Sequence, residues 1–147
     1  MKIHQLSLFL ENKPGHLAEP WRLLAREGVN IRTLSVADTA QFGILRLIIS
    51  DWQKANDVLK SAGYAVNVTE VLAVEVSDRP GGLAEILEVF EHGPINIEYM
   101  YAFTFGRQAK AVLIFRFDKT DEAIARLQPA GINVVESVEV YKAGVSA

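Results

Sequence analysis

The chain contains the same short motif twice, and this internal repeat constrains its fold more than any other feature. The first copy begins with Asn12-Lys13-Pro14-Gly15-His16-Leu17-Ala18, and the second with Asp78-Arg79-Pro80-Gly81-Gly82-Leu83-Ala84. An Asn-Ile pair follows each copy at the same distance, as Asn30-Ile31 and as Asn96-Ile97. Self-similarity at a fixed spacing predicts two structural units related by duplication.

The duplication divides the 147 residues into two predicted domains, residues 1–70 and residues 71–147. Half of the residues are hydrophobic and 22% are charged, a composition typical of globular proteins and not of disordered ones. Each domain is then close to the smallest size at which a single hydrophobic core supports folding.

Hydrophobic periodicity predicts the order strand, helix, strand, strand, helix, strand in the first copy. The predicted strands are residues 3–10, 29–38, 43–50 and 64–69, and the predicted helices run from Leu17 to Gly28 and over 52–62. Gly28 and Gly63 end these helices, and Asp51 is the expected N-cap of the second. Pro20 predicts that the first helix starts late or is kinked.

The second copy repeats this order of elements. Its predicted strands are residues 72–76, 95–104, 109–117 and 132–141, and its predicted helices are 81–92 and 119–129. Asp118 corresponds to Asp51 as a helix cap, and Gly131 corresponds to Gly63. The duplication therefore covers essentially the whole chain.

This element order predicts an α+β protein of two ferredoxin-like βαββαβ units, each with two helices on one face of an antiparallel sheet. Residues 109–117 are apolar on both faces, so this strand needs cover on both sides. Helices would cover one side, and we expect a partner chain to cover the other in a homodimer. Alternating aromatic residues on the preceding strand favour core or dimer packing over ligand stacking: Tyr99, Tyr101, Phe103 and Phe105.

Each Pro-Gly segment connects a predicted strand to a predicted helix, and its chemistry suits an amino-acid ligand. Unpaired N–H groups at a helix N-terminus, together with the helix dipole, favour an anion such as a carboxylate. Gly15 and Gly81 lack a Cβ, so a ligand can approach the backbone closely. Side-chain oxygens of Asn12, Asp78 and the asparagines at the strand starts can accept hydrogen bonds from an ammonium group.

The same segments have a purely structural interpretation. Pro-Gly is a frequent turn dipeptide, and Asn or Asp before a turn often caps the local backbone. Duplication does not separate the two interpretations, because a duplicated domain also keeps its turns for folding. Residue chemistry alone leaves both interpretations open.

The two copies resemble the ACT domain, a small-molecule regulatory module of amino-acid metabolism. The resemblance rests on the turn, the helix and the Asn-Ile strand start, and it extends over residues 3–70 and 71–142. It implies a tandem ACT protein that binds a free amino acid at interfaces between ACT units. The ligand-contacting positions of the family fall on Asn12, Gly15, His16, Leu17, Asn30 and Ile31, and in the second copy on Asp78, Gly81, Gly82, Leu83, Asn96 and Ile97.

The two copies differ at two of these positions, so we do not expect equivalent sites. His16 corresponds to Gly82, and Asn12 corresponds to Asp78. The negative charge of Asp78 repels a carboxylate and attracts an ammonium group. The first copy is therefore the better candidate for a ligand that carries a carboxylate.

Catalytic, metal and cofactor chemistry have little support in the sequence. Cysteine is absent, and His4, His16 and His92 lack the spacing of metal ligands. We therefore expect no catalytic residues, no metal and no cofactor.

Nucleic-acid binding is also disfavoured. The net charge is −3, whereas affinity for nucleic acid depends largely on neutralising phosphates. Residues 110–117 superficially resemble an RNA-binding strand, but Val112 and Ile114 stand where stacking aromatic residues are needed. Arg22 and Arg26 are four residues apart on the first helix, which is typical of a solvated face, with partner docking as the alternative.

Every apolar run is shorter than the ~20 residues of a membrane-spanning helix, and the N-terminus lacks a secretory hydrophobic segment. We therefore expect no membrane association and a cytoplasmic location. The favoured hypothesis is a non-enzymatic regulator that binds a free amino acid and modulates a metabolic enzyme, with an amino-acid biosynthetic enzyme as its partner. The alternative is a structural or regulatory subunit that acts only by protein–protein assembly, without a small ligand.

Overall fold

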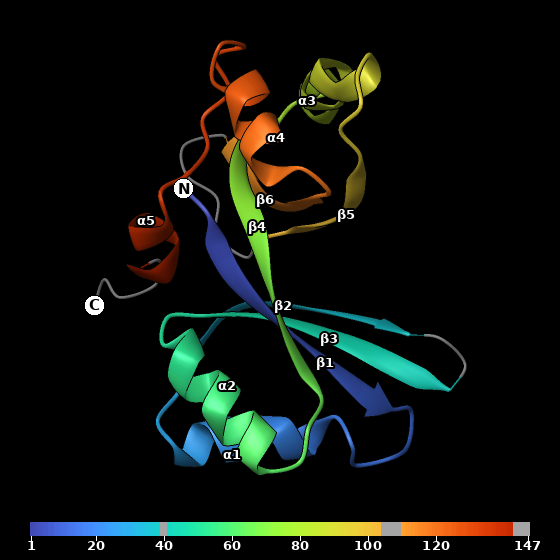
Figure 1. The fold of residues 1–147 in the computed structure, drawn as a ribbon, viewed down its shortest axis with the longest axis vertical. Coiled ribbons are helices and arrows are strands. Elements are labelled where there is room, and N and C mark those ends of the chain that lie inside the picture. The colour runs from blue at the N-terminus through green and yellow to red at the C-terminus, as the bar shows by residue number, and fades with distance from the viewer. Residues whose placement is uncertain (39–40, 104–109, 143–147) are drawn as a thin grey trace. The chain divides into compact units, whose positions relative to one another are not determined.

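The computed structural model describes residues 1–38, 41–103 and 110–142. The described residues form two compact units, one of His4–Thr69 and one of Met1–Ile3 together with the described chain between Glu70 and Lys142. Figure 1 shows their elements, which are β1 (Ile3–Glu11), α1 (Ala18–Arg26), β2 (Ile31–Asp38), β3 (Phe42–Ile49), α2 (Trp52–Ser61), β4 (Val66–Ser77), α3 (Gly82–Glu91), β5 (Ile97–Ala102), β6 (Lys110–Phe117), α4 (Thr120–Leu127) and α5 (Ser137–Lys142).

In the first unit the strands lie in the order β2-β3-β1-β4. β3 pairs antiparallel with both β1 and β2, and the register places Leu6 and Leu34 on either side of Leu47. Alternate leucines of β1 and β3 face α1 and α2, which gives the strands their period-two pattern. The buried core consists of Leu6, Leu8, Leu10, Leu24, Leu45, Leu47, Ile49, Ala55, Leu59 and Val66.

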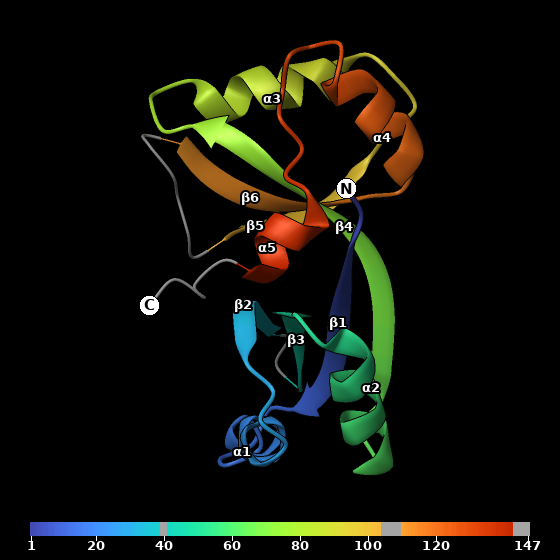
Figure 2. The same cartoon turned by 90° about the vertical axis from the view of Figure 1, so that its left-hand side faces the viewer.

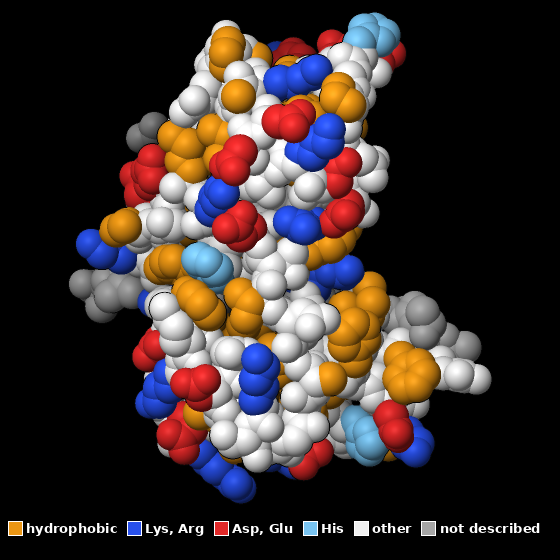
Figure 3. Space-filling model, in the orientation of Figure 1, with side chains coloured by type: hydrophobic (Ala, Val, Ile, Leu, Met, Phe, Trp, Pro, Cys, Tyr) orange, Lys and Arg blue, Asp and Glu red, His pale blue; other side chains and the backbone are white. Residues whose placement is uncertain are grey.

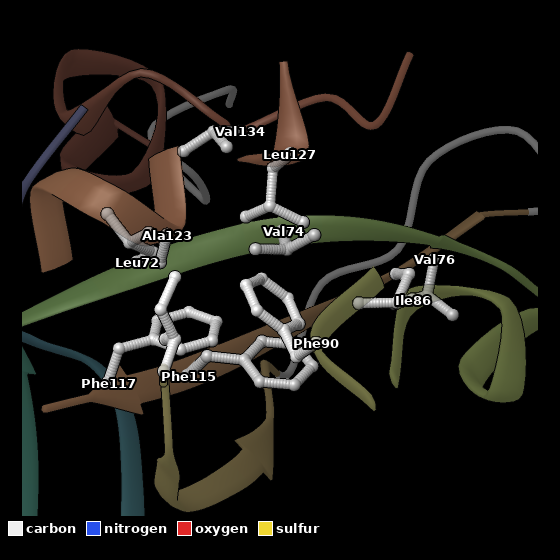
Figure 4. Packing of buried hydrophobic residues seen from close by; sticks show 11 residues of the cluster. Leu72, Val74, Val76, Ile86, Phe90, Phe115, Phe117, Ala123, Leu127 and Val134 are labelled. Atoms are coloured by element: carbon white, nitrogen blue, oxygen red, sulfur yellow. The ribbon is translucent and has the colours of Figure 1, made fainter. Parts of the chain in front are cut away.

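In the second unit the strands lie in the order β4-β6-β5, and β6 pairs antiparallel with both of its neighbours. Figure 4 shows side chains of β4 and β6 packed against those of α3 and α4. One aromatic contact joins β6 to α3, because the Phe117 ring lies 4.8 Å from that of Phe90. Phe117 also stacks on Phe115 of the same strand at 5.7 Å. The core consists of Leu72, Val74, Val76, Ile86, Phe90, Ile95, Phe115, Phe117, Ala123, Leu127 and Val134.

The predicted fold class is confirmed, and several local predictions hold in detail. The Asp51 carboxylate caps α2 by accepting a hydrogen bond from the Lys54 N–H at 3.3 Å. α3 begins at Gly82, the counterpart of His16, whereas α1 begins only at Ala18. The first helix therefore starts late, as Pro20 predicts. Pro20 lies in the first turn of α1, where a backbone N–H has no partner within the helix.

Two of the strand predictions are wrong. The predicted strands 64–69 and 72–76 are parts of one continuous strand, β4, because Glu70 and Val71 between them are not turn formers. In place of the predicted strand 132–141 there is only a bridge between Val74 and Val134, after which the chain turns into α5. Residues 133–135 bond the edge of β4 only briefly, through Glu75 N–H to the Asn133 carbonyl at 3.0 Å and Val135 N–H to the Ala73 carbonyl at 2.8 Å.

The predicted cap of the last long helix is also wrong. The N-cap residue of α4 is Lys119, and no side chain caps it. The Asp118 carboxylate instead accepts a hydrogen bond from the Asn96 N–H at 2.8 Å. The predicted strand ends at Thr104 and Ala109 and the aromatic residue Phe105 lie outside the described residues.

A segment of the same chain, α5, covers part of the sheet face for which a partner chain was expected. Figure 2 shows α5 on the side of the β4–β6–β5 sheet opposite to α3 and α4. Ala73 and Ile114 are paired on that face and are fully buried, and Val140 of α5 is only 2% exposed. The apolar pattern of residues 109–117 therefore does not by itself require a partner chain.

The Arg126 side chain caps the end of α3. Its guanidinium donates hydrogen bonds to the carbonyl oxygens of His92 at 3.0 Å and Val89 at 3.4 Å. Gly93 makes room for it, because a Cβ at this position would lie 2.4 Å from the guanidinium. A cation that donates to the last carbonyls of a helix also interacts favourably with the helix dipole.

We predict that Arg126→Ala lowers the free energy of unfolding by about 1 kcal/mol, because the α3 carbonyls lose a charged donor. Urea denaturation followed by circular dichroism measures this. Arg126→Lys is the control, since it keeps a positive charge at the end of α3, and it should lose less. Equal stability of Arg126→Ala and the parent chain would contradict the capping role.

Candidate functional site

Both Pro-Gly segments form the same type of β-turn. The His16 N–H donates to the Lys13 carbonyl at 3.2 Å, and the Gly82 N–H donates to the Arg79 carbonyl at 3.0 Å. The third residue of each turn has a positive φ, 84° at Gly15 and 87° at Gly81. Proline followed by a positive-φ glycine is the sequence of a type II turn. The local structure therefore requires both glycines even without a ligand.

The two turns leave the same backbone donors unpaired. The N–H groups of Gly15 and Leu17, and of their counterparts Gly81 and Leu83, form no hydrogen bond within the part of the chain that the structure describes. Gly15 and Gly81 are exposed, and a Cβ on Gly15 would meet nothing within 4 Å. Two exposed N–H groups at the entry to a helix are suitable donors for an anionic oxygen.

Around the second turn, most polar groups already have partners within the protein, and the backbone is tightly packed. Arg79 forms an ion pair with Glu85 on the first turn of α3 and donates to the Pro80 carbonyl at 3.3 Å. Gly82 packs so tightly that a Cβ there would lie 2.0 Å from the Ser77 carbonyl oxygen. The Asn96 backbone is occupied as well, because its carbonyl accepts from the Asp118 N–H at 3.1 Å and its N–H is bound by the Asp118 carboxylate.

The first turn is more open. Lys13 pairs with Glu11 at 2.7 Å, and this hydrogen bond, with the nearby charges of Lys13 and His16, lowers the pKa of the Glu11 carboxyl. Asn12 donates its backbone N–H to the Gln41 carbonyl at 3.1 Å, and its side chain is exposed. Asn30 lies immediately before β2 and is exposed. The polar side chains of this copy therefore stay available to a ligand.

A pocket of about 370 Å³ lies beside the first turn, against α1. It is lined by Gly15, Glu19, Arg22, Leu23, Arg26, Ala62 and Tyr64. Burial raises the pKa of the Tyr64 hydroxyl, and the charge of Glu19 and its hydrogen bond to this hydroxyl raise it further. Glu19 is the counterpart of Glu85, so the same glutamate faces an arginine in the second copy and a tyrosine in the first.

The structure brings together only part of the predicted site. Asn12, Gly15, His16 and Leu17 share one turn, and Gly15 is the predicted residue that also lines the pocket. Sequence reasoning missed Glu19 and Tyr64. The position of Tyr64 directly after the helix-ending Gly63 was visible in the sequence, but nothing local indicated that it reaches α1.

The comparisons with known proteins identify the family. The family described as "ACT domain pair" matches residues 1–142. The chain belongs to this family. The resemblance inferred from the two Pro-Gly segments is thereby confirmed, and the two units carry the ACT fold.

Several relatives of this ACT pair are known. A crystal structure of a Bacteroides thetaiotaomicron protein is 38% identical, has a TM-score of 0.88, and covers 97% of each chain. The acetolactate synthase small subunit of Mycolicibacterium smegmatis is 26% identical over 139 residues, which are 92% of this chain and 76% of that protein. The ligand-free regulatory subunit of aspartate kinase from Thermus thermophilus shares the fold, with 15% identity and a TM-score of 0.64. The match covers 88% of this chain and 93% of that chain.

The described residues form no metal-binding cluster, and the face in view in Figure 3 has no long basic stripe. Figure 3 shows acidic and basic side chains interspersed over the face in view. Among residues 1–38, 41–103 and 110–142, no group of three or more His, Asp or Glu side chains is placed to hold a metal ion. Within the same ranges, no helix has the length and apolar character needed to cross a bilayer.

The tight packing of Gly82 makes the second ACT turn more sensitive to an added side chain than the equivalent position of the first. Gly82→Ala should lower the free energy of unfolding by about 1–3 kcal/mol, because the new methyl group meets the Ser77 backbone. His16→Ala is the matched control at the equivalent position and should change stability by less than about 0.5 kcal/mol. Urea denaturation measures both variants, and a neutral Gly82→Ala would mean that α3 shifts away from β4 at little cost.

Proposed function

We propose that this tandem ACT protein is a cytoplasmic, non-enzymatic regulator that binds a free amino acid and modulates a metabolic enzyme. The observation that carries the proposal is the pair of unpaired N–H groups at the same positions of both turns, Gly15 with Leu17 and Gly81 with Leu83. Membership of the ACT family supports it, since the resemblance implies amino-acid binding near these turns.

The first turn is the preferred site for the amino acid. Its N–H groups would donate to the ligand carboxylate, and the side-chain oxygens of Asn12 and Asn30 would accept from the ammonium group. Asn12 is uncharged, whereas its counterpart Asp78 repels a carboxylate. Hydrogen bonds to a charged ligand group are worth about 1.5–3 kcal/mol each, so two donors make a substantial contribution.

An amino-acid biosynthetic enzyme is the proposed partner. Two of the similar proteins are named as subunits of larger enzymes, acetolactate synthase and aspartate kinase. In this chain the signal would pass to such an enzyme when the amino acid binds one arrangement of the ACT units more tightly than another.

A homodimer is part of the same proposal, and the edge strand β2 of the first unit is its most suitable surface. β2 lies at the end of the strand order, and Leu34 and Val36 on it are 46% and 48% exposed. Both residues pair with leucines of β3 that point into the core, so the apolar face of the sheet continues to an uncovered edge. An exposed apolar edge strand readily pairs with another chain.

We predict that Leu34→Lys converts the dimer to a monomer, because a charge on an edge strand blocks pairing. Size-exclusion chromatography with light scattering measures the mass of each form. Lys60→Gln, a charge change on the exposed part of α2, is the control and should leave the mass unchanged. A parent chain that is already monomeric would remove the dimer from the proposal.

Thermal-shift screening against the twenty amino acids tests ligand binding directly. A ligand at about one hundred times its Kd should stabilise the folded state by about 2.7 kcal/mol and raise Tm accordingly. Gly15→Asn should abolish the shift, because asparagine tolerates a positive φ and its side chain enters the open space above the turn. Gly81→Asn should abolish it only if the ligand binds the second turn.

Gly131→Asn is the matched control for Gly15→Asn. Gly131 also has a positive φ of 71° with open space at its Cβ, but it lies outside both turns. This variant should keep the full response. If no amino acid raises Tm at millimolar concentration while a biosynthetic enzyme co-purifies in stoichiometric amount, the alternative of a purely structural subunit is correct.

A further inference from the structure

The pocket beside α1 holds two arginines that have no partner. Arg22 and Arg26 line it one helical turn apart, and neither forms an ion pair or hydrogen bond within the described residues. Arg32, in contrast, donates to Ser50 at 2.8 Å, and Arg116 pairs with Glu98 at 3.0 Å. Two unpartnered guanidinium groups on the wall of one pocket form a concentrated positive charge with up to ten N–H donors.

The second ACT copy provides an internal comparison. At the repeat spacing of 66 residues, Arg22 and Arg26 correspond to Glu88 and His92. Matching the helix-ending Gly63 with Gly131 makes Ile132 the counterpart of Tyr64. Gly15, Glu19 and Leu23 have similar counterparts in Gly81, Glu85 and Val89. The copies thus share the glycine, the glutamate and the apolar residue, and they differ at the two arginines and the tyrosine. The two arginines are not required by the fold, because the second copy forms the same helix without them.

The charge balance of the pocket distinguishes between ligand classes. The two arginines and Glu19 give a net charge of +1 along the wall. The Glu19 carboxylate lies near the Tyr64 hydroxyl, whose pKa it raises, and it is the one acidic group among the residues that line the pocket. A ligand with net negative charge therefore fits better than a zwitterion.

The remaining lining residues complement the uncharged part of such a ligand. Leu23, Ala62 and the Tyr64 ring provide an apolar wall beside the guanidinium groups. The volume of about 370 Å³ lies at the lower end of the roughly 300–1,000 Å³ that small-molecule sites span. Planar guanidinium groups bind carboxylates and phosphates through paired hydrogen bonds.

We propose that this pocket of the first ACT unit is a binding site for a small organic anion, with a carboxylate or phosphate on Arg22 and Arg26 and an apolar body against Leu23 and Tyr64. The site is separate from the amino-acid site proposed at the free N–H groups of the turn. Gly15 borders both, so an anion in the pocket contacts the turn to which the amino acid would bind.

Titration of the full-length, isotope-labelled protein with phenyl phosphate and with benzoate tests the site, followed by amide NMR. Saturable shifts should centre on the amides of Glu19, Leu23 and Tyr64. Inorganic phosphate separates recognition of the anion alone from recognition of the apolar body, and it should bind more weakly than phenyl phosphate.

Removing a positive charge and removing a negative charge from the pocket wall should change Kd in opposite directions. Arg22→Gln and Arg26→Gln should each raise Kd at least about fivefold, because each removes one of the two cations. Glu19→Gln should lower Kd, since it removes the only negative charge of the wall. Lys60→Gln is the matched control, because it removes a positive charge from the same unit outside the pocket, and it should change Kd less than about twofold.

Three results would overturn the proposal. They are the absence of saturable shifts with either organic probe, saturable shifts confined to other residues, and equal Kd values for the parent chain and both arginine variants. The Tm response to amino acids in Arg22→Gln separates this proposal from the one for the turn. That response should persist, so the failure of one site is distinguishable from the failure of the other.

Discussion

The positive φ of one glycine in each Pro-Gly turn is the constraint on which the rest of each unit depends. The turn reverses the chain at the end of the first strand of each copy and starts the helix that packs back over the sheet. Gly15 and Gly81 adopt this conformation at little cost, whereas a side chain there would be strained. The same geometry leaves the N–H groups of Gly15, Leu17, Gly81 and Leu83 without a partner among the described residues. Folding and the proposed ligand binding would therefore both require glycine at these two positions.

Duplication then allowed the two copies to differ around a common backbone. In the second copy, Arg79 pairs with Glu85, Gly82 packs against Ser77, and Asp118 holds the backbone of Asn96. In the first copy the corresponding side chains have other neighbours, because Lys13 pairs with Glu11 and Glu19 lies near Tyr64. In the proposed assignment the second unit is mainly structural, and the first contains both the amino-acid site and the anion pocket.

The long-range order of strands and helices could be predicted because it depends on local signals. The hydrophobic period, the helix-ending glycines and the Asp51 cap all act within a few residues. The errors arose where the outcome depended on pairing between distant segments. The strand predicted over 132–141 has the right composition, but the chain turns into α5 after a single bridge to β4. Asp118 resembles Asp51 in sequence, yet its carboxylate bonds to Asn96 across the unit.

The sequence by itself determined the duplication, the fold class and the two type II turns, because Pro-Gly and alternating leucines act through local backbone geometry. Only the tertiary structure decided which polar groups remain free. Arg22 and Arg26 have the spacing of an ordinary solvated helix face, and they become the wall of a pocket only because Ala62 and Tyr64 lie against α1. Whether a charged side chain lines a pocket depends on the segment that packs beside it. Here that segment lies about forty residues further along the chain, so local sequence signals do not reveal it.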